Sequence, residues 1–438
     1  MITLEDFITG PLEENTEAID VARARWTRKA TIESMTQSNA GAEQSRDYKL
    51  ARAPLLFEYQ KEVVDAVVAQ WDSGQSKVMA SLPTGGGKTR VGLWLVRESL
   101  LQGQATNALW LAPTTELIDQ AVSALEESWF DLGSIPGVRV KVHNVEAVSG
   151  PTSRLAGTIS LCTAKLATKQ LRNVSAYMPD LIVFDEAHQA AAKTYSRLIE
   201  RVGSRRGVRT LGLTATPGRA NSAETEELSR LFDRNLIVPQ SLGQDPVASL
   251  VSAGVLATVY RLSINLPAAW DTVRVGSDSD SSMSVDELSL NGPRFWAVVS
   301  KACEIAQDRR CLIFGASIAH CKALAAAIVA KGLKADLVSY DQPKEERKKK
   351  IDAFRIGAID VLLNKSILIA GFDDPSLQDV ILASPIRSSI QWEQIIGRVS
   401  RGPAVGGTRQ AKVWELDDHG SLHNRVMAAQ RFAGESWD

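Results

Sequence analysis

Short apolar runs alternate with longer segments of helical spacing from about residue 51 onward. In the first half of the chain the apolar runs are residues 78–82, 108–112, 158–162, 181–185 and 210–214. Each run ends at turn residues and precedes a segment whose apolar positions recur every three or four residues. Continuously apolar runs indicate strands buried on both faces, which belong to parallel sheets covered by helices on both sides. The pattern predicts an α/β domain over residues 51–240.

A second alternation of the same kind follows, with apolar runs at residues 311–315, 335–339, 359–363, 379–383 and 412–416. It predicts a second, smaller parallel α/β domain over residues 291–438. Residues 270–289 hold six serines and five acidic residues against one arginine, a composition that cannot bury much apolar surface. We therefore expect a flexible linker within a connecting segment, residues 241–290. Residues 1–50 form an N-terminal appendage whose role the sequence does not indicate.

Composition narrows the class of protein. The 438 residues carry 50 Lys and Arg against 51 Asp and Glu, so any nucleic-acid surface would have to be local. Four cysteines without C-x-x-C spacing argue against a zinc ribbon or a disulfide framework and indicate a reducing compartment. No apolar stretch approaches the roughly 20 residues of a membrane span, and the first ten residues do not resemble a signal peptide. We expect a cytoplasmic location and no membrane partner.

The strongest local signal is the turn LPTGGGKT at residues 82–89, which separates an apolar run from a helical pattern. Backbone N–H groups of such a turn point at phosphate oxygens, Lys88 would add charge at the β- and γ-phosphates, and Thr89 would ligate Mg²⁺. Leu82 replaces the usual first glycine, and the alternative is a glycine-rich turn with a chance lysine. The favoured interpretation is a site for ATP and Mg²⁺ whose phosphate cradle consists of Thr84, Gly85, Gly86, Gly87, Lys88 and Thr89.

The tetrad Asp185-Glu186-Ala187-His188 directly follows another apolar run. An acid at the tip of a buried strand, here Asp185, can hold Mg²⁺, while its neighbour Glu186 aligns and deprotonates a water molecule. On its own such a pair is more often a solvated turn. Lys88 lies 97 residues upstream, after a strand of the same predicted sheet, and this placement favours the catalytic interpretation.

A third pattern, QIIGRVSR at residues 394–401, overlaps the end of a predicted helix over residues 389–399. Arg398 and Arg401 are three residues apart, which predicts that both lie on one helix face. From the second domain they could reach phosphates held by the first, where the planar guanidinium suits a charge-spread transition state. The alternative is a basic helix end that offsets the helix dipole.

Together with four further motifs, these patterns resemble the motif set of superfamily-two helicases and translocases. The nearest group is the DEAH-box group related to the motor subunit of type III restriction enzymes. The further motifs are FEYQ at residues 57–60, PTTEL at 113–117, LTATP at 213–217 and GFD at 371–373, all in family order. The resemblance implies two RecA-like domains in tandem, with ATP hydrolysis coupled to closure of the domains on nucleic acid.

The resemblance also implies roles for individual residues. Nucleotide contacts fall to Gln60, Gly371 and Asp373, and catalysis to Gln394 together with Lys88, Glu186, Arg398 and Arg401. Coupling between the ATP site and the track, the nucleic-acid strand along which the protein would move, is assigned to His188, Thr214 and Thr216. The two threonines could equally fill a strand end. Contacts to nucleic-acid phosphates fall to Thr114, Thr163 and Lys365, so binding should be independent of sequence and sensitive to salt.

Several departures from the family pattern concern the track. Thr115 stands in place of an arginine, Lys365 and Ser366 stand where Thr and Asp are usual, and Ala370 replaces Glu or Arg. Lys365 can still hold a phosphate, but Ser366 cannot supply a carboxylate for coupling. Two rivals therefore stay open. One is a nucleotide-gated clamp on nucleic acid, and the other is a double-stranded DNA translocase that remodels forks without separating strands.

The motif set resembles DNA motors more than the DEAD-box RNA group, so DNA is favoured over RNA as the track. About 37 residues follow Arg401, from which we expect a nearly bare motor that depends on a protein partner or has limited processivity. Compact helicases of this kind occur in bacteria and phages, which suggests a bacterial or phage-infected cell.

Three features are interpreted as structural. The run KEERKKK at residues 344–350 is expected to be the solvated face of a helix rather than a nucleic-acid patch. Trp71, Trp94 and Trp110 are expected in the core. Residues Cys303, Cys311 and Cys321, with His320 nearby, are expected to be structural thiols rather than a metal site.

Overall fold

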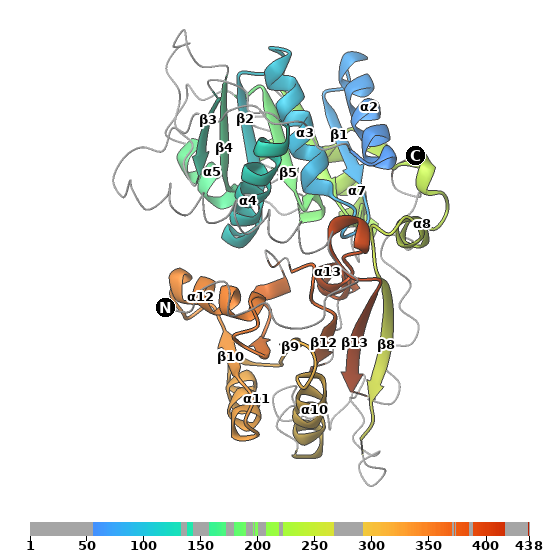
Figure 1. Cartoon of the computed structure of the whole chain (residues 1–438). Coiled ribbons are helices and arrows are strands. Elements are labelled where there is room, and N and C mark those ends of the chain that lie inside the picture. The colour runs from blue at the N-terminus through green and yellow to red at the C-terminus, as the bar shows by residue number, and fades with distance from the viewer. Residues whose placement is uncertain are drawn as a thin grey trace, which may run out of the picture. The chain divides into compact units, whose positions relative to one another are not determined.

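Two parallel sheets form the frame of the protein in a computed structural model (Figure 1). The structure describes residues 56–132, 138–142, 157–171, 179–189, 196, 198–199, 207–218, 222–266, 292–369, 372, 374–384, 389–416 and 437. Residues 46–438 form one compact unit. The first sheet has the order β3-β4-β2-β5-β6-β1-β7, and every neighbouring pair is parallel. Its strands are β1 (Lys77–Ser81), β2 (Asn107–Ala112), β3 (Val138–Val142), β4 (Gly157–Thr163), β5 (Leu181–Asp185), β6 (Arg209–Thr214) and β7 (Leu236–Ile237).

The second sheet is also parallel, with the order β10-β11-β9-β12-β13-β8. Its strands are β8 (Thr258–Ile264), β9 (Cys311–Phe314), β10 (Ala335–Val338), β11 (Val361–Asn364), β12 (Asp379–Leu382) and β13 (Gln410–Leu416). The predicted fold class, two parallel α/β sheets in tandem, is confirmed.

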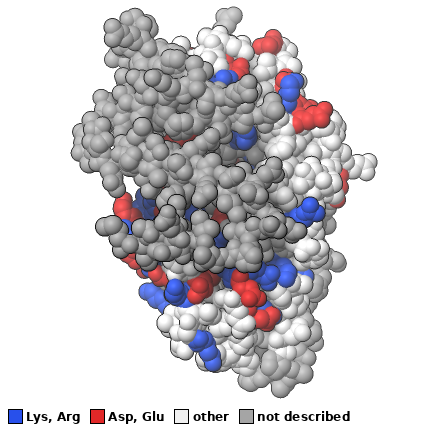
Figure 2. Space-filling view, viewed as in Figure 1, with Lys and Arg blue, Asp and Glu red and all other residues white. Residues whose placement is uncertain are grey.

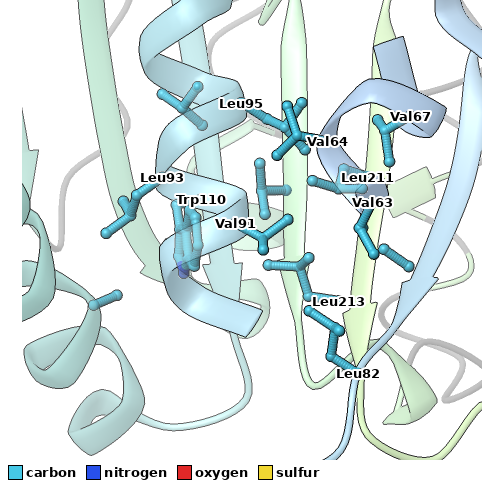
Figure 3. Packing of buried hydrophobic residues seen from close by; sticks show 14 of the residues in the cluster. Val63, Val64, Val67, Leu82, Val91, Leu93, Leu95, Trp110, Leu211 and Leu213 are labelled. Carbon is cyan, nitrogen blue, oxygen red and sulfur yellow. The ribbon is translucent and has the colours of Figure 1, made fainter. Parts of the chain in front are cut away.

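Helices cover both faces of each sheet because successive strand residues point in opposite directions. In the first sheet, Val78 and Ala80 of β1 join one apolar cluster, whereas Met79 joins the other. The first cluster is packed by α2 (Glu58–Asp72), α3 (Lys88–Leu101) and α4 (Thr115–Leu132) (Figure 3). The second is packed by α5 (Ala164–Leu171), η2 (Ala187–Gln189) and α7 (Ser222–Leu231).

The second sheet has the same arrangement. Leu312 of β9 points into a cluster with α12 (Lys344–Arg355) and α13 (Ser389–Val399), whereas Ile313 points toward α10 (Gly292–Ile305) and α11 (Ile318–Ala330). Short elements complete the described chain: η4 (Gln240–Leu242), α8 (Pro246–Ser252), η6 (Ile367–Ile369) and η7 (Pro403–Val405).

All ten apolar runs form strands, but the sequence analysis missed β3, β7 and β8. The last of these, β8, lies within residues 241–290, the predicted connecting segment, and pairs with β13 at one edge of the second sheet. Its residues 258–263 are exposed or half-buried, so the strand lacks the continuous apolar signature of a central strand. The domain boundaries themselves stay predictions.

The remaining structural expectations have mixed outcomes. Trp71 and Trp110 are buried in the first core, and Trp94 packs against it half-buried. Cys311 and Cys321 are buried, Cys303 is half-buried, and the described residues contain no cluster of three or more potential metal ligands. The N-terminal appendage (residues 1–50) and the expected linker (residues 270–289) lie outside the described residues. No described helix has the length and apolar character needed to cross a membrane.

Candidate active site

The glycine-rich turn after β1 forms a loop that ends at the first turn of α3. Gly85 and Gly87 have φ angles of +85° and +84°, in the left-handed region where a side chain would be strained. The N–H of Gly86 donates to the Pro83 carbonyl at 2.8 Å, and Lys88, only 8% exposed, begins the helix. The loop therefore brings a helix N-terminus and a buried lysine to one place, as an anion site requires.

Leu82, which departs from the usual glycine pattern, has a structural role. Its N–H donates to the Thr214 carbonyl at 3.0 Å, and its side chain lies in the first core. The backbone pairing of β1 with β6 thus continues to Leu82, one residue past the end of β1. The strained conformations fall on Gly85 and Gly87 instead.

Gln60, predicted to contact the nucleotide base, is buried against the phosphate loop. Its Nε2 donates to the Gly86 carbonyl at 3.0 Å, and its Oε1 accepts from the Phe57 N–H at 3.1 Å. Tyr59 donates to the same carbonyl at 2.9 Å, and burial raises its pKa to about 12. Both side chains thus hold the Gly86 carbonyl of the phosphate loop. Contact of Gln60 with a nucleotide base stays a prediction.

The two acids after β5 differ in electrostatic environment. Burial and the adjacent Glu186 carboxylate raise the pKa of Asp185 to about 7, although Lys88 and Arg398 oppose this. Burial also disfavours ionisation of Glu186, but Lys88, His188 and Arg398 outweigh it and lower its pKa to about 2. Glu186 itself has a φ of +52°, an uncommon conformation outside glycine. Lys88 and Arg398 therefore act on both acids, and the shifts favour the charged form at Glu186 more than at Asp185.

A chain of polar contacts joins the acids to the turn after β6. His188 Nδ1 lies 3.3 Å from Glu186 Oε2 and 3.3 Å from Thr214 Oγ1. The Thr214 hydroxyl donates to the Thr216 carbonyl and accepts from the Thr216 N–H, both at 3.0 Å. Thr216 Oγ1 is buried, with no hydrogen-bond partner among the described residues. The three predicted coupling residues therefore lie together next to Glu186.

The two arginines of QIIGRVSR approach this site from the second sheet. Arg401 Nη1 donates to the Gly85 carbonyl at 3.1 Å, and the charge of buried Arg398 acts on both acids. The expectation that both lie on one helix face is wrong, because α13 ends at Val399 and Arg401 pairs with Leu256 in a β-bridge. Pro403 also disfavours helical geometry at Gly402, so the chain beyond Arg401 cannot resume this helix. The predicted catalytic residue Gln394 is half-buried within α13.

Sequence analysis missed a close contact between the two sheets at Gly397. A Cβ atom at this position would lie 1.9 Å from Cγ2 of Thr84 in the phosphate loop, so only glycine permits the observed approach. A glycine within a predicted helix was the available signal, since it lowers helix propensity unless close packing requires it.

The donor set of the loop fits a magnesium nucleotide. Thr89 offers a hydroxyl and Asp185 a buried carboxylate, both hard oxygen ligands of the kind that Mg²⁺ takes beside phosphate oxygens. Lys88 and the α3 N-terminus match the negative charge of a phosphate chain. The residues present are therefore suited to both ATP and Mg²⁺.

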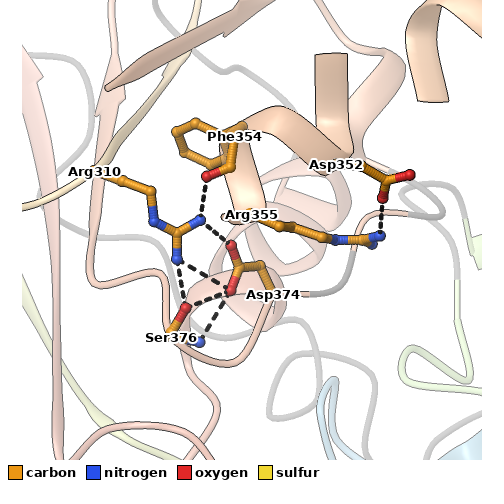
Figure 4. Close-up of polar contacts among 6 residues, drawn as sticks. All are labelled: Arg310, Asp352, Phe354, Arg355, Asp374 and Ser376. Carbon is orange, nitrogen blue, oxygen red and sulfur yellow. Dashed lines mark hydrogen bonds and ion pairs between the residues drawn. The ribbon is translucent and has the colours of Figure 1, made fainter. Parts of the chain in front are cut away.

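Two described residues within and directly after the GFD motif (residues 371–373), Phe372 and Asp374, make defined contacts. Gly371 and Asp373, predicted to contact the nucleotide, lie outside the described residues. Phe372 is buried, and its ring centroid lies 6.3 Å from that of Phe354. Arg310 donates to Asp374 Oδ2 at 2.6 Å, to the Phe354 carbonyl at 2.7 Å and to Ser376 (Figure 4). These contacts hold Phe372 within the motif and Asp374 directly after it.

The three predicted nucleic-acid contacts occupy strand ends or turns. Thr114 Oγ1 accepts from the Leu117 N–H at 3.3 Å, and Thr163 Oγ1 accepts from the Leu166 N–H at 3.4 Å, so both hydroxyls cap helices. Thr163 pairs with Ala112 in the strand register, which places both caps at the same edge of the first sheet. Lys365 is exposed after β11 in the second sheet. Their contacts with nucleic acid stay predictions.

The basic run of residues 344–350 forms the start of α12 and is largely ion-paired. Lys344 Nζ lies 2.7 Å from Asp119 Oδ2, and Arg347 Nη2 lies 3.4 Å from Glu116 Oε1, both acids being on α4. Lys350 pairs within the second sheet, with Asp336 and Glu346. Figure 2 shows Lys and Arg atoms next to Asp and Glu atoms on one face of the molecule. The run begins a helix, as expected, and Lys344 and Arg347 on it also form ion pairs with α4.

Comparison with protein families gives two matches. The family described as "Type III restriction enzyme, res subunit" matches residues 54–219, and the family "Helicase conserved C-terminal domain" matches residues 296–402. The first match contains the phosphate loop and DEAH, and the second contains the QIIGRVSR motif.

Two helicase sequences are similar to this chain over most of its length. IRC3 of Saccharomyces cerevisiae, provisionally named an ATP-dependent helicase, is 25% identical over 79% of this chain and 49% of its own length. The DNA 3'-5' helicase XPB of Kineococcus radiotolerans is 25% identical over 86% of this chain and 64% of its own length. The chain thus spans between about half and two thirds of these relatives.

A solved structure supports the fold. The ATP-dependent Type ISP restriction-modification enzyme LlaBIII bound to DNA superposes with a TM-score of 0.59 at 15% identity. The match covers 87% of this chain and 29% of that enzyme. At this identity the likeness concerns the fold.

Proposed function

Because the chain belongs to the superfamily-two helicases, in the group related to the motor subunit of type III restriction enzymes, we propose that it is a nucleic-acid-stimulated ATPase. It converts hydrolysis into movement along, or separation of, nucleic-acid strands. The observation that carries this proposal is the meeting of Lys88, Glu186 and Arg401, which come from both sheets, at one phosphate loop.

In the proposed mechanism, the loop amides and Lys88 hold the β- and γ-phosphates, while Thr89 and Asp185 hold Mg²⁺. ATP bound there supplies the phosphoanhydride bond whose hydrolysis releases free energy. Glu186, ionised beside Lys88, orients the attacking water and accepts its proton. Arg398 and Arg401 place positive charge where negative charge develops on the transferred phosphoryl group.

Closure of the two sheets supplies the coupling in this proposal. Arg398 lies on α13 of the second half and its charge acts on both acids of the first, so separation of the two halves would weaken this interaction. In the first sheet, contacts run from Glu186 through His188 to Thr214 and Thr216, so a change at the acids can be transmitted to the turn after β6. Nucleic acid that favours the closed arrangement would then raise turnover.

We propose DNA as the preferred track and Thr114, Thr163 and Lys365 as contacts to its phosphates. Support comes from the resemblance to DNA motors and from the names of two comparison proteins, a DNA 3'-5' helicase and a restriction enzyme bound to DNA. A protein partner that supplies specificity and a location in a bacterial or phage-infected cytoplasm are also proposed. Because the contacts would be to phosphates, binding should weaken steeply with salt.

The test is steady-state ATP hydrolysis with no polymer, single-stranded DNA, duplex, forked DNA and RNA, beside a strand-displacement assay. We expect stimulation by DNA that added salt reduces, and no turnover by a Lys88→Ala control. Stimulation by duplex without strand displacement would favour the translocase, and nucleotide-dependent DNA binding without hydrolysis would favour the clamp. Equal turnover with and without every polymer would contradict the proposal.

A further inference from the structure

Trp437 belongs to the second half of the chain but contacts the first sheet. It lies 21 residues after Leu416, the last residue of β13. Its side chain is only 7% exposed and joins the apolar cluster that contains Phe184, Ala187 and Phe232. The indole is thus buried in a core of the first sheet, although in the sequence it follows the strands of the second sheet.

The hydrogen bond of this indole identifies what it touches. Trp437 Nε1 donates to the Pro217 carbonyl at 2.9 Å, a contact across 220 residues of sequence. Pro217 is itself buried and directly follows Thr216. A buried carbonyl needs a donor, and Trp437 is the donor that the structure gives it.

The turn after β6 is therefore held on both sides. From one side Thr214 bonds both the N–H and the carbonyl of Thr216, and it also contacts His188 beside Glu186. From the other side Trp437 holds the Pro217 carbonyl. A shift of this turn would move the Thr214 hydroxyl relative to His188, since the four residues 214–217 form one tight segment.

We infer that Trp437 is a positioning residue that braces the turn after β6 and so maintains the link from Thr214 to His188. This inference rests on the proposed function for its effect on turnover, but its structural part does not. The hydrogen bond of Trp437 is to the turn itself, so its effect is expected to be local to that turn.

The test uses the full chain with Trp437→Ala, Trp437→Phe and a matched control, Trp296→Ala, in which an indole that is 52% exposed is removed from α10. Melting temperature, ATP turnover with and without single-stranded DNA, and hydrogen exchange of residues 207–218 are measured on each preparation. We expect Trp437→Ala to lower DNA-stimulated kcat about threefold to thirtyfold, the range typical of contacts along a coupling network.

The KM for ATP should change little, and residues 207–218 should exchange faster. Trp437→Phe, which fills the site but lacks the N–H, should lie between, and the control should match the parent. Parental kcat and parental exchange in Trp437→Ala would overturn the inference, as would an equal loss in Trp296→Ala. If the parent itself hydrolyses no ATP, the proposed function fails. Hydrogen exchange of residues 207–218 then tests the structural part of the inference on its own. Faster exchange in Trp437→Ala would support it, and unchanged exchange would reject it.

Discussion

The two sheets share one topology but not one chemistry. When the strands of each are numbered within their own half, both follow the order 3-4-2-5-6-1, and the first adds β7 at its edge. In the first sheet the strands β1, β5 and β6 lead into the phosphate loop, Asp185 and Thr214. Their counterparts β8, β12 and β13 end at Ile264, Leu382 and Leu416, which are apolar.

The second sheet contributes to the site through a helix instead. Arg398 is on α13, which follows β12, and β12 has the topological position that β5 has in the first sheet. DEAH thus begins at the end of its strand, whereas QIIGRVSR lies at the end of the helix that follows the equivalent strand. Polar groups of the second sheet serve structure: buried Asn364 at the end of β11 donates to the Ile313 carbonyl at 3.2 Å. One fold can hold a nucleotide or supply arginines, depending on which residues end its strands.

The largest effect should come from breaking the chemistry of the first sheet. Glu186→Gln removes the proposed base without changing side-chain size, so turnover should fall about 10²–10⁴-fold. Nucleotide binding should persist, because Lys88 and the loop amides are intact. Parallel measurement of turnover and nucleotide affinity checks both parts, with Glu304→Gln on α10 as a control. Parental turnover in Glu186→Gln would show that another group activates the water.

A smaller loss is expected from the second sheet's contribution. Arg401→Lys keeps the charge but lacks the planar fork that reaches the Gly85 carbonyl, so turnover should fall about 10²-fold, less than for complete removal of such an arginine. Affinity for ATP should stay near that of the parent. A lower melting temperature with unchanged turnover per folded molecule would mean that Arg401 only packs.

The contact between the sheets can be tested separately from either chemistry. Gly397→Ala would place a methyl group against Thr84 Cγ2, and relief of that clash should move α13 from the loop. We expect DNA-stimulated turnover to fall about tenfold, since overpacking costs about 1–3 kcal/mol. Adding Thr84→Ser, which removes the Cγ2 methyl, should restore part of the loss. Gly292→Ala is the control, because nothing lies within 4 Å of a Cβ there.

The smallest effect should come from the ion pairs between α12 and α4. Lys344→Glu opposes Asp119, but both side chains are partly exposed, so the change should be within about 1 kcal/mol and should fade in salt. The double variant Lys344→Glu/Asp119→Lys should recover the parental melting temperature. If the single variant is unchanged at low salt, this pair contributes nothing to the contact.

The sequence predicted the groups that are local in the chain. The loop at residues 82–89 and DEAH each follow a buried strand, and parallel strands bring their ends to one sheet edge, so their meeting was predictable. Contacts set by packing between distant segments were not. The Gly397–Thr84 approach, the Trp437–Pro217 bond and the departure of Arg401 from its helix depend on how surfaces meet. Strand β8 was missed because an edge strand half-exposed to solvent lacks the apolar run that marks a central one.

The chain passes from one core to the other between two consecutive residues. Leu256 packs in the first core, where its Cδ2 would meet a Cβ on Gly85, and Ala257 packs in the second. Backbone bonds from the Ala257 N–H to Ser400 and from the Gly402 N–H to Val255 attach the Arg401 segment to the same place. Any rotation of one sheet against the other would be absorbed by the few backbone dihedrals of this hinge. Arg401 then lies close to the axis of such a rotation, so its backbone would move little. Its guanidinium, which contacts the phosphate loop, would move further than its backbone.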